Sequence, residues 1–202
     1  MSRKSEVVKP KVDRRVQRTR NALGDAFIAL IQERKFETIT VQHVLDRADV
    51  GRSTFYSHYR DKNDLFLSDL EDFFELMSDS LSARGDTSNR VAPVAELFTH
   101  VAEMRPLRAA LIAADKHRDV LEMGQGYFAR AIERRLNKIP ASNKVPSRKR
   151  TAMAQAFAGA LLALMSWWLD QSSPASPKEM DDLYHQLVWS GVATQTVSMA
   201  KR

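Results

Sequence analysis

The chain has 202 residues, of which 44% are hydrophobic, and its net charge is +6. It contains no cysteine, which excludes a disulfide framework and a thiolate metal site and suits a reducing cytoplasm, where we expect the protein to reside. No apolar run approaches the roughly 20 residues that span a bilayer, and no apolar stretch follows the basic N-terminus to make it a secretory signal, so we expect no membrane segment.

The positive charge is concentrated at the N-terminus. Residues 1–20 hold 8 Lys/Arg against 2 Asp/Glu, and residues 1–64 hold 14 against 9. Residues 65–202 hold 17 against 16. A basic end attracts polyanions, nucleic acid first and an anionic membrane surface second. Taken alone, residues 1–10 are explained equally well as a solvated, disordered tail.

Apolar residues recur at spacings of three and four, and glycine and proline number only 7 each. This pattern is typical of an all-α fold, here of about nine helices joined by short loops. Four helices are expected in the first part of the chain, over about residues 13–34, 41–48, 52–59 and 62–82. Asp13, Thr40 and Asp61 are the expected N-caps of the first, second and fourth. Five further helices are expected over about residues 91–104, 107–114, 120–137, 148–170 and 177–199.

Residues 40–62 have the pattern of a helix-turn-helix, with a tight turn at 49–51 between two short helices. The second helix of such a unit enters the DNA major groove with its N-terminal residues toward the base edges. Arginine there reads guanine, and serine or threonine donates to bases or contacts a thymine methyl. The leading turn carries Arg52, Ser53 and Thr54. The side chains placed to reach flanking phosphates are Tyr56, His58 and Lys62. The alternative is a helical hairpin with a scattered charged face.

A longer block of residues carries a family resemblance: Ile39-Thr40-Val41, Ala48, Val50, Thr54-Phe55-Tyr56, His58-Tyr59 and Lys62-Asn63-Asp64-Leu65-Phe66. In this block the chain resembles the DNA-binding end of the TetR family of bacterial transcriptional regulators, over about residues 14–66. Three positions depart from the family's pattern. Asp49 stands where the turn usually carries glycine, Gly51 where serine or threonine usually begins the recognition helix, and Leu45 where a small alanine is common.

The resemblance implies DNA contacts for several residues of this segment. The residues implied to contact phosphates are Thr40, Tyr56, His58 and Lys62. Those implied to face the groove are Gln42, Arg52, Ser53, Thr54 and Ser57. The basic arm is expected to reach the DNA backbone or the minor groove, above all through Arg14, Arg15 and Arg18.

The two last long helices are apolar enough to need cover on more than one side. Two such helices from each of two subunits can form an intermolecular four-helix bundle, as the resemblance also implies; the alternative is that they complete a monomeric core. The expected dimer contacts are Phe157, Leu161, Leu164, Trp168, Leu187 and Gly191. Family members often bind a small apolar or amphipathic ligand in this part of the chain, although ordinary core packing has the same composition. The candidate pocket walls are Phe73, Phe74, Met77, Phe98, Met104, Met123, Tyr127, Phe128 and Trp167.

We therefore expect a flexible basic arm over residues 1–12, a helix-turn-helix DNA-binding domain over 13–62 and a helical effector-binding and dimerisation domain over 63–202. The expected function is that of a homodimeric transcriptional regulator, a repressor that binds double-stranded DNA at a palindrome and is released by a small-molecule effector. No histidine lies at a metal-ligand spacing and no nucleophile elbow or phosphate loop occurs, so we expect no metal, no cofactor and no catalysis. The alternatives are an architectural DNA-binding protein without an effector and a peripheral membrane protein that uses the basic first helix.

Overall fold

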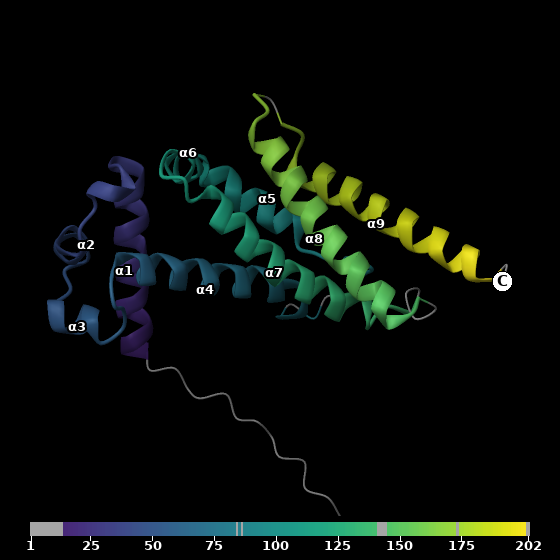
Figure 1. The fold of residues 1–202 in the computed structure, drawn as a ribbon, viewed down its shortest axis with the longest axis horizontal. Coiled ribbons are helices and arrows are strands. Elements are labelled where there is room, and N and C mark those ends of the chain that lie inside the picture. The colour runs from purple at the N-terminus through teal and green to yellow at the C-terminus, as the bar shows by residue number, and fades with distance from the viewer. Residues whose placement is uncertain (1–13, 84, 86, 141–144, 173, 201–202) are drawn as a thin grey trace, which may run out of the picture. The chain divides into compact units, whose positions relative to one another are not determined.

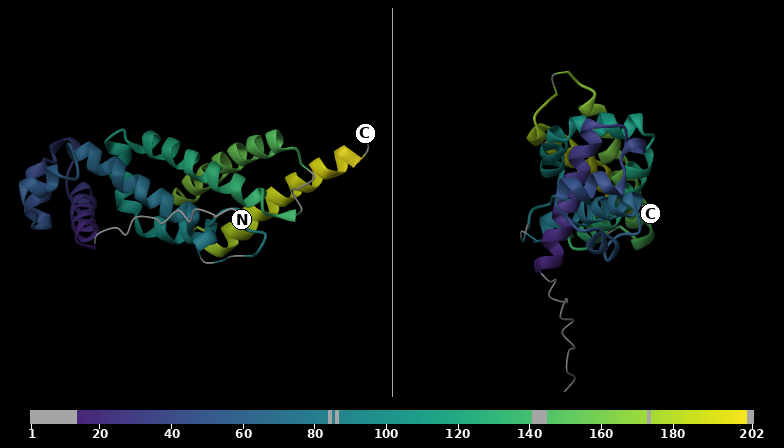
Figure 2. Two further views of the ribbon diagram at one scale, coloured as in Figure 1. Left: turned by 90° about the horizontal axis from the view of Figure 1, so that it is seen from below. Right: turned by 90° about the vertical axis from the view of Figure 1, so that its left-hand side faces the viewer.

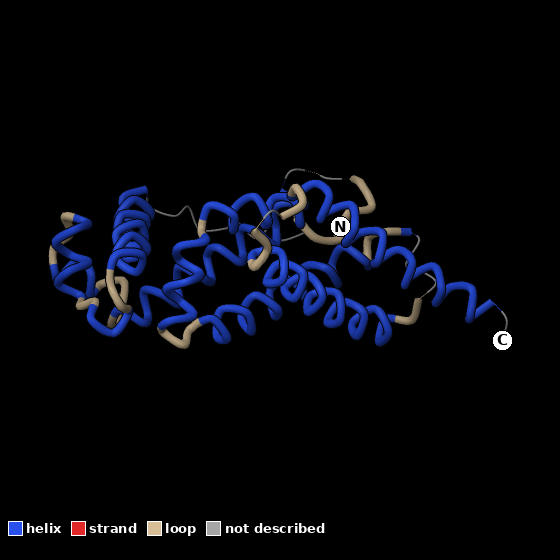
Figure 3. The backbone as a smooth tube through the Cα atoms, turned by 90° about the horizontal axis from the view of Figure 1, so that it is seen from above, coloured by secondary structure: helices blue, strands red, loops and turns tan. Residues whose placement is uncertain are grey.

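The computed structural model describes residues 14–83, 85, 87–140, 145–172 and 174–200. These residues form nine α-helices and one short 3-10 helix, and no strand occurs among them (Figure 3). The predicted all-α fold is confirmed. The expected basic arm and the Asp13 cap lie outside the described residues.

The chain divides into two compact units between Leu67 and Ser68. The sequence-based boundary at residue 62 coincides instead with the first residue of helix α4 (Lys62–Ala83), which runs across the division (Figure 1). Each unit has its own set of buried side chains. The functions expected of the two parts stay predictions.

The first unit contains α1 (Arg14–Glu33), a 3-10 helix η1 (Phe36–Thr38), α2 (Val41–Ala48), α3 (Arg52–Tyr56) and the start of α4. Three aromatic rings pack edge to face at its centre, with centroids 5.6 to 6.2 Å apart. They belong to Phe27, Phe36 and Phe66. This arrangement joins α1, the turn after it and the first turns of α4, and edge-to-face packing is the geometry that aromatic quadrupoles favour.

The second unit contains the rest of α4 and five further helices. These are α5 (Val94–Glu103), α6 (Arg105–Ala113), α7 (His117–Leu136), α8 (Ser147–Leu169) and α9 (Pro177–Ala200). Helix α7 packs along α8, and α5 packs along α9 (Figures 1 and 2). Large side chains with almost no exposed surface fill the space between these helices, among them Phe98, Phe128, Leu161, Trp168 and Tyr184.

Helix α8 corrects one sequence-based expectation. By length and composition it is apolar enough to cross a membrane, with a mean hydropathy of 1.4 over an 18-residue window. The expectation that no apolar run approaches the length of a membrane-spanning helix was therefore wrong. Within the protein, 39% of that window is buried. A core helix covered on more than one side has the same composition as a membrane helix, and α8 alone is therefore weak evidence for a membrane span.

A cluster of charged side chains, here called the polar clamp, ties the segment before α5 to α9. It consists of Arg90, Glu96, Asp181 and His185. Arg90 donates to the Glu96 carboxylate at 3.1 and 2.5 Å and to Asp181 Oδ1 at 3.2 and 2.8 Å. The Val91 N–H donates to His185 Nε2 at 3.0 Å, so His185 carries its proton on Nδ1, which lies 2.8 Å from the Asp181 carbonyl oxygen.

A close contact between α4 and α7 gives a test of the packing in the second unit. A Cβ atom added at Gly124 would lie 2.8 Å from two ring carbons of Phe74, which is itself buried. We expect Gly124→Ala to lower the free energy of unfolding by about 2 kcal/mol, because overpacking a rigid core outweighs alanine's better helix propensity. Denaturant unfolding measures it.

Gly126 provides the matched control for this substitution, on the same helix. A Cβ at Gly126 would meet only the Arg130 guanidinium, at 3.5 Å, so Gly126→Ala is expected to stabilise the protein by about 1 kcal/mol. Equal effects of the two substitutions would show that Phe74 yields to the added methyl group.

Candidate nucleic-acid interface

Thr40 fixes the start of α2. Its Oγ1 accepts the His43 N–H at 3.2 Å, and its own N–H donates to His43 Nδ1 at 3.3 Å, which completes a capping box. Histidine stands where glutamate or glutamine is usual in this motif. The Thr40 hydroxyl acts as an acceptor in the cap, so its hydrogen is left to donate outward, as a phosphate contact requires.

The turn between α2 and α3 is made at Asp49. Its backbone is left-handed, with φ 53° and ψ 46°, and the N–H groups of Asp49 and Val50 both donate to the Leu45 carbonyl. Aspartate adopts this conformation more readily than most residues, which explains how the turn closes without the usual glycine. Gly51 has an ordinary φ of −68° and caps α3 without a side chain.

Helix α3 is shorter than predicted and ends at Tyr56. The Ser57 hydroxyl donates to the Thr54 carbonyl at 2.6 Å, and the N–H groups of residues 58 and 59 both turn back to Phe55. Phe55 and Tyr59 are buried, with ring centroids 5.7 Å apart. The other side chains of residues 52–57 are all exposed: Arg52, Ser53, Thr54, Tyr56 and Ser57.

Two of the predicted groove-facing residues contact each other across the helix-turn-helix. Arg52 Nη2 donates to Gln42 Oε1 at 2.9 Å, and Gln42 Nε2 donates to Asp46 Oδ1 at 2.7 Å. These bonds join the outer face of α2 to the first residue of α3. Sequence reasoning missed Asp46, although its position four residues after Gln42 places both on one face of a helix.

Lys62 is engaged within the protein. Its Nζ lies 2.7, 3.2 and 2.8 Å from the carbonyl oxygens of Phe36, Glu37 and Ile39, and 4.9 Å from the centre of the Phe36 ring. An ammonium group has three N–H donors, so all three are taken. Burial holds its pKa below the usual value, and the nearby Glu37 opposes this only in part. The predicted phosphate contact would require Lys62 to leave these carbonyls.

Asp61 caps α4 as predicted. Its Oδ1 accepts the N–H groups of Asn63 and Asp64 at 2.8 and 2.9 Å. The Asp64 carboxylate accepts from the backbone N–H of Arg60 at 2.8 Å. These bonds satisfy N–H groups that the start of a helix leaves without an intrahelical partner, and they fix the direction in which the chain leaves the recognition segment.

The predicted basic contacts of the first helix are only partly described. Arg14, Arg15 and Arg18 are exposed on the first turns of α1, where a polyanion can reach them. His58 is half-buried, with its ring 6.2 Å from that of Tyr59. Residues 1–12 lie outside the described part of the chain.

Comparisons with known proteins agree with this geometry. Residues 25–68 match the model of the family described as bacterial regulatory proteins, tetR family. The chain is 40% identical over 55 residues to YxbF of Bacillus subtilis (strain 168), an uncharacterized HTH-type transcriptional regulator, and the match spans 27% of this chain and 14% of that relative. A solved TetR transcriptional regulator from Streptococcus agalactiae 2603V is 27% identical, with a TM-score of 0.58, and the alignment covers 87% of this chain and 96% of that one.

These comparisons support a transcriptional regulator of the TetR family, whose family model matches residues 25–68 of this chain. The dihydroxyacetone kinase operon activator DhaS, 16% identical with a TM-score of 0.63 over 87% of this chain and 97% of its own, shares the fold. The family is one of transcriptional regulators rather than enzymes. The family match extends from α1 to α4 and includes the predicted DNA-binding residues 40–62, whereas Arg14 and Arg15 precede it.

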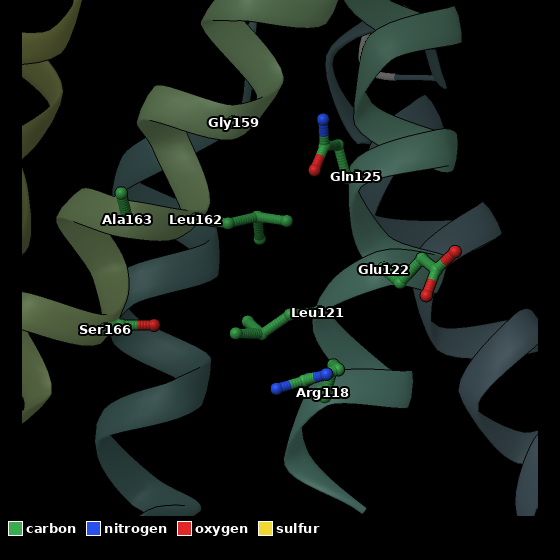
Figure 4. A pocket seen from close by; sticks show the side chains of 8 residues that line it. All are labelled: Arg118, Leu121, Glu122, Gln125, Gly159, Leu162, Ala163 and Ser166. Atoms are coloured by element: carbon green, nitrogen blue, oxygen red, sulfur yellow. The ribbon is translucent and has the colours of Figure 1, made fainter.

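In the second unit a cavity of about 340 Å³ lies between α7 and α8 (Figure 4). Arg118 and Ser166 lie at one end of it, Gln125 and Gly159 at the other, and Leu121 between them. The Ser166 hydroxyl is buried and has no hydrogen-bond partner among the described residues. None of the predicted pocket residues lines this cavity: Phe73, Phe74, Met77, Phe98, Met104, Met123, Tyr127, Phe128 and Trp167.

Those predicted pocket residues lie elsewhere in the second unit. Phe74, Phe98 and Phe128 are buried in the core, and Trp167 is 53% exposed. The others are half-buried: Phe73, Met77, Met104, Met123 and Tyr127. Their role as walls of a ligand pocket stays a prediction.

The predicted dimer contacts need a correction of helix phase. Leu161 and Trp168 are 0% and 3% exposed within their own protomer, so they are not available to a partner. The Trp168 indole N–H donates to the Ala175 carbonyl at 2.6 Å. Of the other predicted contacts, Leu187 is 60% exposed, and Phe157 and Leu164 are half-buried. The burial of Gly191 lies outside the described part of the chain. The outward face of α8 instead carries Ala156, Ala160, Ala163 and Trp167.

Proposed function

We propose that the protein is a sequence-specific DNA-binding transcriptional regulator whose helix α3 enters the major groove. The observation that carries this proposal is the division of α3 into two faces. Phe55 is buried within the first unit, while the guanidinium group of Arg52 and the hydroxyl groups of Ser53, Thr54 and Tyr56 are exposed on the same short helix. A protein that reads base edges needs such a face on a firmly packed helix.

The proposed active form is a homodimer in the cytoplasm. Small residues along the outward face of α8 permit close approach of a second helix, and Trp167, Leu183 and Leu187 supply exposed apolar surface on α8 and α9. A two-fold dimer presents two recognition helices, so it binds a palindromic operator. The dimer represses transcription by occupying the operator. Its release requires a ligand that binds the DNA-free conformation of the protein more tightly than the DNA-bound one.

The cavity between α7 and α8 is the proposed effector site. Arg118 and the Ser166 hydroxyl, which has no partner among the described residues, provide polar groups at one end, and Leu121 and Leu162 provide an apolar wall. Glu122 also lines the cavity, but its carboxylate points away from the space between the two helices (Figure 4). This combination fits an amphipathic molecule with an acidic group. Such molecules are to be screened for release of the protein from its selected DNA, and the absence of any response across acidic amphipaths would contradict the assignment.

Selection of bound fragments from randomised duplex DNA tests the function directly. The purified protein is incubated at about 150 mM salt, where non-specific binding is weak, and the bound DNA is sequenced. A palindromic motif is the expected result. A lack of enrichment with uniform weak binding indicates an architectural DNA-binding protein, and binding to anionic vesicles in place of DNA indicates a peripheral membrane protein.

Tyr56 gives a test of the phosphate contacts. Tyr56 is 50% exposed, and its hydroxyl makes no hydrogen bond within the described part of the chain, so it can donate outward. We expect Tyr56→Phe to weaken binding to all duplexes alike, by about 3- to 10-fold, without changing the selected motif, because phosphate contacts carry no sequence information. Fluorescence anisotropy on specific and random duplexes measures it.

Tyr59→Phe is the matched control, because it also removes one tyrosine hydroxyl. Tyr59 is buried and its hydroxyl accepts from Arg20 Nε at 3.2 Å, so this substitution should lower the melting temperature and leave the affinity of the folded protein for DNA nearly unchanged. A change of motif in Tyr56→Phe would contradict its assignment to the backbone.

A further inference from the structure

Arg52, Gln42 and Asp46 form a continuous chain of hydrogen bonds on the exposed face of the helix-turn-helix, here called the Arg52 relay. We propose that Arg52 is the base-reading residue of this relay, specific for guanine, and that Gln42 and Asp46 are positioning residues that hold it. This inference rests on the proposed function and gives three exposed side chains one shared task.

The chemistry of the two ends fixes the orientation of the amide between them. A carboxylate only accepts hydrogen bonds and a guanidinium only donates them. Gln42 must therefore direct its NH₂ group toward Asp46, at 2.7 Å, and its oxygen toward Arg52, at 2.9 Å. Exchanging the two ends of the amide would break both bonds, so the relay has one direction.

The Arg52 guanidinium keeps the donors that guanine needs. Only Nη2 contacts Gln42, and no other hydrogen bond of Arg52 is found in the described part of the chain. Both hydrogens of Nη1 and the second hydrogen of Nη2 are left, which is the fork that contacts guanine O6 and N7. A side chain already held in place loses less conformational entropy when it binds.

Gln42 lacks the same freedom. Glutamine reads adenine by accepting from N6 and donating to N7 together. Its oxygen already accepts from Arg52, and its nitrogen already donates to Asp46. Only one lone pair and one N–H of the Gln42 amide are then left for a base, against three hydrogens on the terminal nitrogens of Arg52.

Asp46 places a negative charge on the face that meets DNA, where it opposes general attraction to phosphates. Its effect on affinity and its effect on discrimination therefore have opposite signs. Removing the charge should strengthen binding to random duplexes, while removing the acceptor should weaken the preference for guanine. Asparagine removes the charge and retains an acceptor, whereas alanine removes both.

The test compares variants on the motif selected by the wild-type protein and on duplexes with single base-pair changes. Gln42→Ala and Arg52→Ala should lower the preference at the same guanine, Arg52→Ala by about tenfold or more, and the double variant should resemble Arg52→Ala. Asp46→Ala should lose part of that preference, and Asp46→Asn should keep it. Melting temperatures of these exposed variants confirm that they are folded.

Each outcome has a distinct meaning. If Gln42→Ala relaxes a different base pair from Arg52→Ala and the two effects add, Gln42 reads its own base and the relay is overturned, while the proposed function stands. An unchanged preference in Asp46→Ala removes Asp46 from the relay. If the wild-type protein selects no motif, the proposed function and the relay are overturned together.

Discussion

Asp181→Asn is expected to lower the free energy of unfolding at pH 7 by about 3 kcal/mol, because it removes one charge from a largely buried ion pair and leaves Arg90 only half-compensated. The Asp181 and Arg90 side chains are 13% and 25% exposed, and they meet at 2.8 Å. Because Glu96 retains its contact with Arg90, the expected loss of stability lies toward the lower end of the range for breaking a buried ion pair. For a chain of this length the melting temperature should fall by about 10 °C.

The same interaction should make the protein sensitive to acid. Burial alone would raise the pKa of Asp181, but hydrogen bonds from His185 and Arg90 and the charge of Arg90 outweigh it and hold the pKa below its ordinary value. A carboxyl with a depressed pKa in the folded state stabilises the protein above its unfolded pKa, about 4, and loses that contribution as the pH falls through the folded pKa. The difference in stability between wild type and Asp181→Asn should therefore shrink below pH 4.

Urea unfolding of both proteins at pH 7 and at about pH 3 measures this difference. Asp182→Asn is the control on the same helix, since the Asp182 side chain is 64% exposed and, among the described residues, pairs with the exposed Lys178. Exposed pairs contribute little to stability, so Asp182→Asn should resemble the wild type. If the difference in unfolding free energy between the wild type and Asp181→Asn stays constant with pH, packing rather than charge stabilises the polar clamp.

The structure of the recognition segment could be predicted well from the sequence, because it depends on residues that are close to one another along the chain. Thr40 and Asp61 each cap a helix through N–H groups two or three residues away. Asp49 makes a left-handed turn that bonds back to Leu45. These are short-range effects of side chains on their own backbone, so residue type and spacing are sufficient to predict them.

The phase of α8 could not be predicted in the same way. Trp167 and Trp168 are adjacent and chemically identical, yet one is 53% exposed and the other 3%. A helix that is apolar around most of its circumference has no polar face to show which side points outward. Partners outside the helix distinguish the two rings: Arg105 lies over the Trp168 ring at 5.5 Å, and the Ala175 carbonyl accepts the Trp168 indole N–H.

Lys62 shows the same limit within the recognition segment. Its carbonyl partners lie 23 to 26 residues earlier in the chain, where no short-range pattern points to them. The family resemblance implies a phosphate contact at this position, and the structure shows an internal one. The two roles make opposite predictions for a substitution that keeps the stem of the side chain and removes its charge.

Lys62→Met is expected to lower the free energy of unfolding by about 2 kcal/mol, because hydrogen bonds from an ammonium group to three carbonyls are lost and nothing replaces them. The depressed pKa shows that burial disfavours the charge itself, so the stabilisation comes from these bonds and from the position of Nζ over the Phe36 ring. The logarithm of DNA affinity should keep its slope against the logarithm of salt concentration.

Lys35→Met is the control, since Lys35 is exposed beside the same turn and its ammonium makes no hydrogen bond among the described residues. It removes the same charge without touching the three carbonyls, and its melting temperature should match the wild type. A phosphate contact by Lys62 would instead reduce the salt slope by about one and leave stability nearly unchanged. Thermal melting and a salt titration of binding, made on both variants, therefore decide whether Lys62 meets DNA or joins α4 to the turn before α2.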